Sequence, residues 1–354
     1  MGITNWGALV SHGNAKGRQD VLAIIEAGLR AADPYDHVAQ LIRVEKNQLI
    51  VGNPVFEPRG APVSGEEVYD LDAVGKILVV GAGKGVQRMA LAIEDILGER
   101  LTGGHVIDKK GPTGAYLKRI GVTLGAHPVP DEACAQGCRR ILELLRDLHP
   151  NDLVFTIGAS GFSSLLTLPA PGVSLEDVRR TVYLMQIERG APTSDLSPIR
   201  NHLDAMKGGR ISAYIHPARA IHIMAKDPND YETLIYRNTW FHTLPDHSTF
   251  ADAMANLKKW NAWEAAPASV RAFLERADPA YETIKPDRYQ QLAYRIYGIM
   301  PGQEGSWPAP RAQAEELGYR AVSLARGLQV EASQAGVVMA SIARTIERIG
   351  SPFE

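Results

Sequence analysis

The sequence is poor in cysteine, in long apolar runs and in basic clusters, and each scarcity excludes a class of protein. Cys134 and Cys138, its only two cysteines, stand four residues apart on one face of a predicted helix. Helical positions at this spacing are poorly placed for a disulfide, and a metal site needs more ligands. We therefore expect two buried thiols.

No segment reaches the ~18 uninterrupted apolar residues of a membrane-spanning helix, and residues 1–14 contain no charged region followed by an apolar one. We expect no membrane partner and, by default, a cytoplasmic location. The net charge is −2, without a basic stripe, so we expect no nucleic-acid partner. An anionic substrate must then be held by local groups.

The bulk composition is that of an ordinary globular protein, with 45% hydrophobic and 22% charged residues. The 354 residues exceed the ~100–200 of a typical domain. We therefore expect two domains or one large α/β unit.

The most informative stretch is a predicted strand at 76–80 that runs into a glycine loop and then a helix. Gly81, Gly83 and Gly85 surround Lys84, and apolar residues then recur at helical spacing from Val86. Such a loop directs backbone N–H groups, a helix N-terminus and a cation at one point, which suits phosphate.

The loop matches neither of the common nucleotide-binding motifs. It lacks the spacing of a Walker A loop, and Val86 replaces the last glycine of the dinucleotide fingerprint. A tight strand-to-helix turn with an exposed lysine is the alternative interpretation.

Strand candidates recur regularly along the chain and alternate with helical or loop segments. This rhythm predicts an α/β fold: a Rossmann-like, doubly wound, mostly parallel sheet with helices on both faces, plus the start of a second α/β domain. The strands are expected at 76–80, 104–108, 121–126, 152–158 and 220–226.

Three loops follow strands at the edge where such sheets bind ligands, and we expect them to converge on one cleft. They are the glycine loop, His127–Asp131 and residues 158–166. A fourth segment, 197–210, concentrates cations around a glycine pair, which suits an anion better than a helix. A solvated helix face is the alternative.

These motifs, in this order, resemble the glycerate 2-kinase family, whose N-terminal domain is known as DUF4147 and is often described as hydroxypyruvate reductase. The resemblance rests on Gly81-Ala-Gly-Lys-Gly85, His127-Pro-Val-Pro-Asp131, Arg200-Asn-His-Leu203 and Lys207-Gly-Gly-Arg210. It implies a two-domain α/β enzyme that transfers the γ-phosphate of ATP, with Mg²⁺, to a hydroxyl of glycerate between the domains. The implied partners are ATP and a small sugar acid, and a homodimer is an expected assembly.

The resemblance also implies roles for individual residues. Lys84 would be the catalytic cation, and Arg200, Lys207 and Arg210 would hold carboxylate or phosphate. We further predict a nucleotide site of Gly81, Gly83, Gly85, Ser160, Gly161 and Ser163, with His127, His202, Gly208 and Gly209 on the substrate. Asp152 and Asp230 are candidate Mg²⁺ ligands or bases, and we assign Asp230 to catalysis and Asp152 to the metal. The alternatives are a surface acid for Asp230 and a turn residue for Asp152.

Three segments depart from the family pattern. Ala159-Ser-Gly-Phe-Ser163 replaces a Ser-Gly-Gly-Gly-Ser loop, and Trp240-Phe-His-Thr243 replaces Ser-Gly-Pro-Thr. Ala225-Lys-Asp-Pro-Asn-Asp230 replaces Ser-Asp-Val-x-Gly-Asp and keeps only its last acid. Phe162, Trp240 and Phe241 are therefore expected to shape the pocket for a different sugar acid.

We expect residues 1–277 to form the DUF4147-like domain and 278–320 a connection. Residues 321–354 would be the first strand-helix unit of a C-terminal domain called MOFRL, and without its remainder we expect weak activity. Two alternatives stay open: an oxidoreductase that binds NAD(P), with Asp108 on the ribose, and a protein that binds nucleotide or sugar acid without catalysis.

Overall fold

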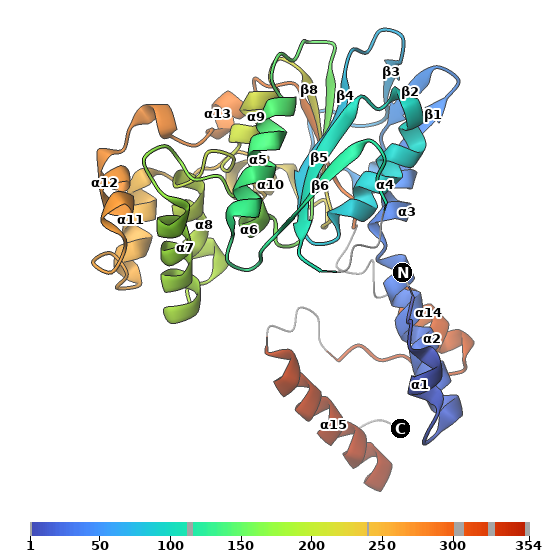
Figure 1. The fold of residues 1–354 in the computed structure, drawn as a ribbon. Coiled ribbons are helices and arrows are strands. Elements are labelled where there is room, and N and C mark those ends of the chain that lie inside the picture. The colour runs from blue at the N-terminus through green and yellow to red at the C-terminus, as the bar shows by residue number, and fades with distance from the viewer. Residues whose placement is uncertain (1, 112–115, 239–240, 301–307, 325–329, 351–354) are drawn as a thin grey trace. The chain divides into compact units, whose positions relative to one another are not determined.

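The computed structural model describes residues 2–111, 116–238, 241–300, 308–324 and 330–350, and the chain divides into two compact units. The first unit consists of Met1–Ile3 and Gly28–Pro308, and the second of Thr4–Ala27 and Ala309–Glu354. The large sheet and every predicted site residue belong to the first unit (Figure 1).

A six-stranded parallel sheet forms the centre of the first unit, in the order β6-β5-β4-β7-β8-β9. All five strands predicted for it are present to within two residues, which confirms the α/β fold class. The strands are β4 (Ile77–Ala82), β5 (Gly103–Lys109), β6 (Ile120–Gly125), β7 (Leu153–Gly158), β8 (Arg219–Met224) and β9 (Tyr294–Gly298).

Both faces of this sheet are covered. Alternate strand residues point to opposite sides, so each strand contributes side chains to two cores. Ile77 and Val79 pack in one core, and Leu78 and Val80 pack in another. The first core includes α3 (Pro34–Leu41), α4 (Val86–Leu97) and a small antiparallel sheet of β1 (Ile42–Glu45), β2 (Gln48–Val51) and β3 (Glu67–Asp70). The second includes α5 (Glu132–Leu144), α6 (Phe162–Leu165), α9 (Arg210–Ile215), α10 (Tyr231–Tyr236) and α13 (Pro286–Tyr289).

The two cysteines lie in this second core, as predicted. Cys134 and Cys138 are on α5, where both thiols are free and buried. Burial raises the pKa of the Cys134 thiol to about 11, so the thiol stays protonated at neutral pH.

A third core lies inside a group of helices beside the sheet, which we call the helical cluster (Figure 1). Leu196, Phe250 and Phe273 are buried there among the other apolar side chains of the cluster. Its elements are α7 (Leu175–Tyr183), the π-helical turn η3 (Leu184–Glu188), α8 (Thr193–His202), α11 (Phe250–Lys259) and α12 (Ala268–Arg276). Short 3-10 turns elsewhere are Pro54–Phe56, Gly98–Arg100 and Pro279–Tyr281.

The second unit is helical. It contains α1 (Trp6–Val10), most of α2 (Ala15–Ala31), most of α14 (Pro308–Glu316) and α15 (Ala332–Ile349). Tyr319 Oη donates to Asp20 Oδ2 at 2.7 Å, which joins the segment after α14 to α2. No helix of the described ranges has both the length and the apolar character needed to cross a membrane.

The late part of the chain differs from its predicted elements. The helix predicted at 331–349 is present as α15, but residues 321–324 form no strand and Ala325 lies outside the described residues. The segment 278–320 was predicted to be a connection, yet it supplies β9. Tyr294, Arg295 and Tyr297 give this strand a composition unlike the apolar runs of its neighbours.

Candidate functional site

The order of the strands places a ligand-binding edge between β4 and β7. The chain passes outward from β4 to β5 and β6, then returns to β7 on the other side of β4. Parallel sheets bind ligands at the carboxyl ends of the strands beside such a reversal. The glycine loop follows β4 and residues 159–163 follow β7, and Lys84 N donates to Ser160 O at 2.7 Å between the two loops.

The glycines allow these two loops to touch. A Cβ at Gly81 would lie 1.9 Å from Ile157 O, and one at Gly83 would lie 2.6 Å from Ala159 N. Gly85, with a φ of 80°, precedes the first residue of α4. Gly81 and Gly83 are thus required for packing at this edge, and Gly85 for its left-handed backbone conformation.

The loop N–H groups already have partners within the protein, so the predicted phosphate cradle does not agree with this geometry. The bonds are Gly83 N to Ile107 O (3.0 Å), Lys84 N to Ser160 O (2.7 Å), Gly85 N to Asp108 Oδ1 (3.1 Å) and Val86 N to Gly83 O (3.3 Å).

Both carboxylate oxygens of Asp108 accept hydrogen bonds from the glycine loop or the start of α4. Its Oδ1 accepts from Gly85 N, and its Oδ2 accepts from Gln87 Nε2 at 2.9 Å, while the residue is buried. A nicotinamide cofactor of the usual kind needs this carboxylate for its ribose. The position of Asp108 therefore speaks against the oxidoreductase alternative.

A cavity of about 420 Å³, which we call the basic pocket, lies beside these loops. It brings together five predicted site residues: His127, Ser160, Gly161, Ser163 and Arg200. The other lining residues are Pro128, Phe162, Ser164, Gln186, Thr193, Ala225 and Lys226. None of these lining residues is acidic, so the pocket favours an anion.

Arg200 supplies a buried positive charge without an acidic partner. It lies on α8 with 8% of its surface exposed, and its Nη2 donates to Gln186 Oε1 at 2.8 Å. No carboxylate of the described residues forms an ion pair with it. Burial lowers the pKa of the guanidinium to about 10. A buried charge of this kind is stabilised by an anionic ligand.

His127 and Lys84 meet at Gly161. A Cβ at Gly161 would lie 2.9 Å from His127 Cδ2 and 3.3 Å from Lys84 Cγ, so Lys84 reaches the edge of the basic pocket. Partial burial lowers the pKa of His127, and the charges of Lys84, Lys109 and Arg200 lower it further. His127 is therefore mainly neutral at pH 7 in a positive surrounding.

The Lys207-Gly-Gly-Arg210 segment does not line the basic pocket, so the structure does not favour its predicted role in substrate binding. The Lys207 ammonium is buried and pairs with Asp204, and it also donates to Thr167 Oγ1 at 2.9 Å. Arg210 Nη1 donates to two backbone oxygens, Asn201 O at 2.7 Å and Lys207 O at 2.9 Å. Cations among glycines suit internal pairing as well as they suit an anion.

The glycine pair itself serves packing and backbone conformation. Gly208 and Gly209 have φ values of 62° and 80°, which favour glycine. A Cβ at Gly208 would lie 2.6 Å from Thr283 Cγ2, and Gly209 N donates to His242 O at 3.0 Å.

His202 is fully buried and does not line the basic pocket. Its Nδ1 bonds Pro198 O and its Nε2 bonds Glu282 Oε1, both at 2.7 Å, and its ring lies 4.6 Å from that of Phe250. This histidine joins α8 to the 279–285 segment, so its geometry does not favour the predicted contact with substrate.

Neither predicted acid lies at the basic pocket. Asp152 precedes β7, at the opposite end of the sheet, where it accepts from Lys76 N (2.6 Å) and His149 N (2.7 Å). Asp230 forms an exposed ion pair with Arg59 at 2.9 Å. Within the described ranges no three His, Cys, Asp or Glu side chains group as metal ligands. The turn and surface roles thus fit Asp152 and Asp230.

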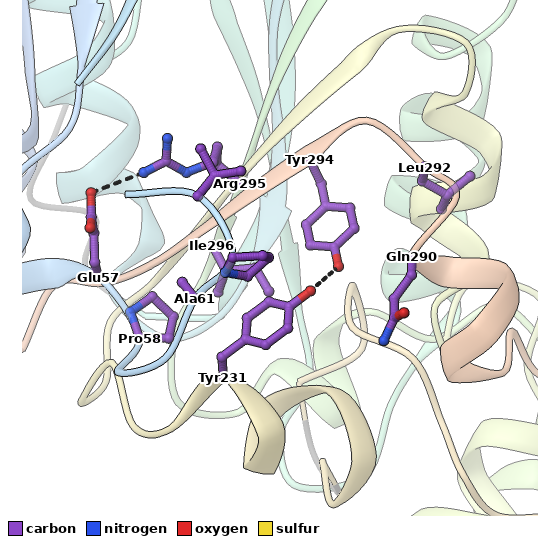
Figure 2. Close-up of a pocket in the computed structure, with 11 residues that line it drawn as sticks. Glu57, Pro58, Ala61, Tyr231, Gln290, Leu292, Tyr294, Arg295 and Ile296 are labelled. Carbon is purple, nitrogen blue, oxygen red and sulfur yellow. Dashed lines mark hydrogen bonds and ion pairs between the residues drawn. The ribbon is translucent and has the colours of Figure 1, made fainter. Parts of the chain in front are cut away.

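A second pocket, of about 370 Å³, lies at the outer edge of β9. Figure 2 shows Tyr231 and Tyr294 facing each other there, with hydroxyls 2.6 Å apart, and Arg295 turned toward Glu57 at 2.9 Å. Its lining contains no predicted site residue. Because its one arginine is already paired, it is less suited to an anion than the basic pocket.

Sequence reasoning missed several residues of the basic pocket. Gln186 and Thr193 belong to no motif, and Lys226 stands in a segment noted only because it departs from the family pattern. Trp240, which was expected to shape the pocket, lies outside the described residues. His242 stands in a segment noted only for its departure from the family pattern, yet its Nε2 lies 2.7 Å from Ser163 Oγ. The departure of this segment from the family pattern was the sequence signal that pointed to His242.

The profile of a family described as "Domain of unknown function (DUF4147)" matches residues 20–275. A glycerate 2-kinase of Pyrococcus horikoshii is 32% identical over 339 residues, covering 95% of this chain and 71% of that protein. The chain belongs to the glycerate 2-kinase family.

Other family members match this chain over most of its length. A D-glycerate 2-kinase of Thermotoga maritima is 28% identical over 79% of this chain and 63% of its own length. A solved Pyrococcus horikoshii structure matches with a TM-score of 0.67 and 30% identity, covering 95% of this chain and 72% of that one. The chain thus spans between about three fifths and three quarters of these family members.

Proposed function

We propose that this protein transfers a phosphoryl group from ATP to a hydroxyl of glycerate or a related small sugar acid. The observation that carries the proposal is Arg200, a buried guanidinium with no acidic partner among the described residues. It lines a pocket whose described lining contains no carboxylate. The names of the family members agree with this chemistry.

Arg200 supports binding of the carboxylate of the acid. A planar guanidinium offers parallel donors that match carboxylate geometry. Gln186 occupies one nitrogen, Nη2, and keeps the side chain oriented. The rest of the sugar acid would then lie toward Gly161 and Ser163, at the carboxyl end of β7.

Lys84 supports the transfer step. The acceptor oxygen bonds the γ-phosphorus while the bond from that phosphorus to the bridging oxygen breaks, ADP leaves and the hydroxyl proton is released. Such transfer depends mainly on positioning and on positive charge near the phosphoryl oxygens. Lys84 is exposed beside Gly161 and carries that charge to the edge of the basic pocket.

Magnesium does not fit the residues described at this pocket. Mg²⁺ prefers one or two carboxylates together with phosphate oxygens. The lining of the basic pocket contains no acidic residue, and Asp152 is bound to backbone N–H groups at the far end of the sheet. We assign no magnesium ligand in this part of the chain.

The test measures acid binding and ADP release separately. Calorimetric titration with glycerate and four- to six-carbon sugar acids reports on the pocket, and a coupled assay with ATP reports on transfer. Arg200→Met should abolish binding, whereas Lys84→Ala should keep binding and lose turnover. The control is Arg179→Met, an exposed arginine paired with Glu176 on α7. Binding of no acid, or equal binding by Arg200→Met, would refute the proposal.

A second candidate function comes from the names of two relatives. Two Agrobacterium vitis proteins, 29% and 31% identical to this chain, are called putative hydroxypyruvate reductases. Oxidation of NADH in the presence of hydroxypyruvate tests this activity. The buried, fully engaged Asp108 leads us to expect none.

A further inference from the structure

A histidine lies directly behind the basic pocket and touches one of its hydroxyl groups. His242 is 1% exposed, and its Nε2 lies 2.7 Å from Ser163 Oγ. The imidazole ring also packs against Phe162, with ring centroids 5.5 Å apart. Ser163 lines the pocket and His242 does not, so the histidine can act on a ligand only through the serine.

The imidazole is neutral because of what surrounds it. Burial lowers the pKa of His242 well below its usual value, and the nearby charges of Lys207 and Arg200 lower it further. A neutral imidazole has one nitrogen that accepts a hydrogen bond. If Nε2 is that nitrogen, Ser163 donates its proton inward and presents only lone pairs to the pocket.

Such an acceptor complements the two cations of the lining. Arg200 and Lys226 can only donate, and the Oε1 of Gln186 already accepts from Arg200. Ser164 donates its hydroxyl to Ala126 O at 3.1 Å. A sugar acid brings a carboxylate, which needs donors, and hydroxyls, whose protons need acceptors.

We propose that His242 is a positioning residue that fixes Ser163 as the hydrogen-bond acceptor for a hydroxyl of the bound sugar acid. The inference rests on the proposed function and adds to it the group that distinguishes a hydroxy acid from a plain carboxylic acid. It also gives a role to the Trp240-Phe-His-Thr243 segment, where the chain departs from the family pattern.

The test compares two acids that differ in their hydroxyls. Glycerate and propanoate share the three-carbon carboxylate, but propanoate has no hydroxyl. We expect Ser163→Ala and His242→Leu to weaken glycerate binding roughly tenfold, the scale of one hydrogen bond, and to leave propanoate binding unchanged. His242→Gln offers Ser163 an amide oxygen and should recover most of the glycerate affinity.

The matched control is a second buried histidine of the same kind. His105 is 4% exposed, and its Nε2 lies 2.7 Å from Thr123 Oγ1, but neither residue lines the basic pocket. His105→Leu breaks a comparable bond and should leave the affinities for both acids unchanged.

A direct measurement on the unmodified protein complements the variants. Nitrogen-15 spectra of the imidazole should show the Nε2 of His242 without a proton. A protonated Nε2, or a loss shared equally by glycerate and propanoate, would overturn the inference while leaving the proposed function intact. If the unmodified protein binds neither these two acids nor any sugar acid of the larger panel, the proposed function itself has failed.

Discussion

Replacing Arg200 with methionine should stabilise the protein while removing its anion site. The side chain is buried, no described carboxylate pairs with it, and its one bond is to the neutral amide of Gln186. Methionine has a similar length and carries no charge. Replacing an uncompensated buried charge by an apolar group of similar size is often stabilising.

The pKa of the guanidinium gives the size of the effect. It falls from 12.5 to about 10, and each unit corresponds to ~1.4 kcal/mol, so burying the charge costs about 3 kcal/mol. Losing the hydrogen bond to Gln186 costs about 1.5 kcal/mol of stability and offsets part of this gain. The net gain in the free energy of unfolding is therefore about 1–2 kcal/mol. Because the folded pKa is the lower one, this cost is fully present below about pH 10 and declines only as the pH rises toward 12.5.

The assay is urea denaturation at pH 7, with and without glycerate or inorganic phosphate. Without an anion, Arg200→Met should exceed the wild type in stability, and Arg179→Met should stay within about 0.5 kcal/mol of it. With an anion, only proteins that keep Arg200 should gain stability, because ligands stabilise the state they bind. If Arg200→Met is less stable than the wild type in anion-free buffer, the charge is not uncompensated and the reasoning is refuted.

Three further predictions concern the surroundings of the site. Lys207→Met leaves the carboxylate of Asp204 buried without its partner and should cost about 3–5 kcal/mol in urea denaturation. Asp204→Asn removes the charge and keeps an acceptor for the neighbouring backbone N–H groups, so failure of the double variant with Asp204→Asn to recover part of the loss would contradict the structural role. Gly83→Ala places a Cβ 2.6 Å from a backbone nitrogen of the loop after β7 and should cost more than about 2 kcal/mol, against about 1 kcal/mol for Gly60→Ala, which meets open space. Hydrogen bonds and ion pairing hold the pKa of Glu282 at about 2 rather than 4.5. About 3 kcal/mol of stability that is present at neutral pH should therefore be lost as the pH falls from 4.5 to 2. Glu282→Gln should flatten that decline, and an unchanged dependence of stability on pH would exclude this role of Glu282.

The sequence predicted the centre of the fold well because local patterns decide it. Buried parallel strands read as short apolar runs between glycines, so β4 to β8 were found. β9 was not predicted because Arg295 breaks the apolar pattern. The charge of Arg295 is balanced by Glu57, which is 238 residues distant along the chain. No local pattern contains that information.

The site was predicted only in part for a similar reason. Loops at the carboxyl ends of parallel strands converge by geometry, which is why His127, Ser160, Gly161 and Ser163 meet in the basic pocket. The cations of segment 197–210 look alike in the sequence, but only Arg200 lines that pocket. Residue type gives the charge, and the tertiary packing decides whether its partner is a ligand or the protein.

The basic pocket lies where two separately packed cores meet. Arg200 and Gln186 come from the helical cluster, whereas His127 and Ser163 come from loops of the sheet. Domains open in cooperative parts, each with its own free energy of opening. An anion held between the two cores would couple their opening, so the amide protons of α8 and β7 should exchange with solvent at rates that slow together as the pocket fills.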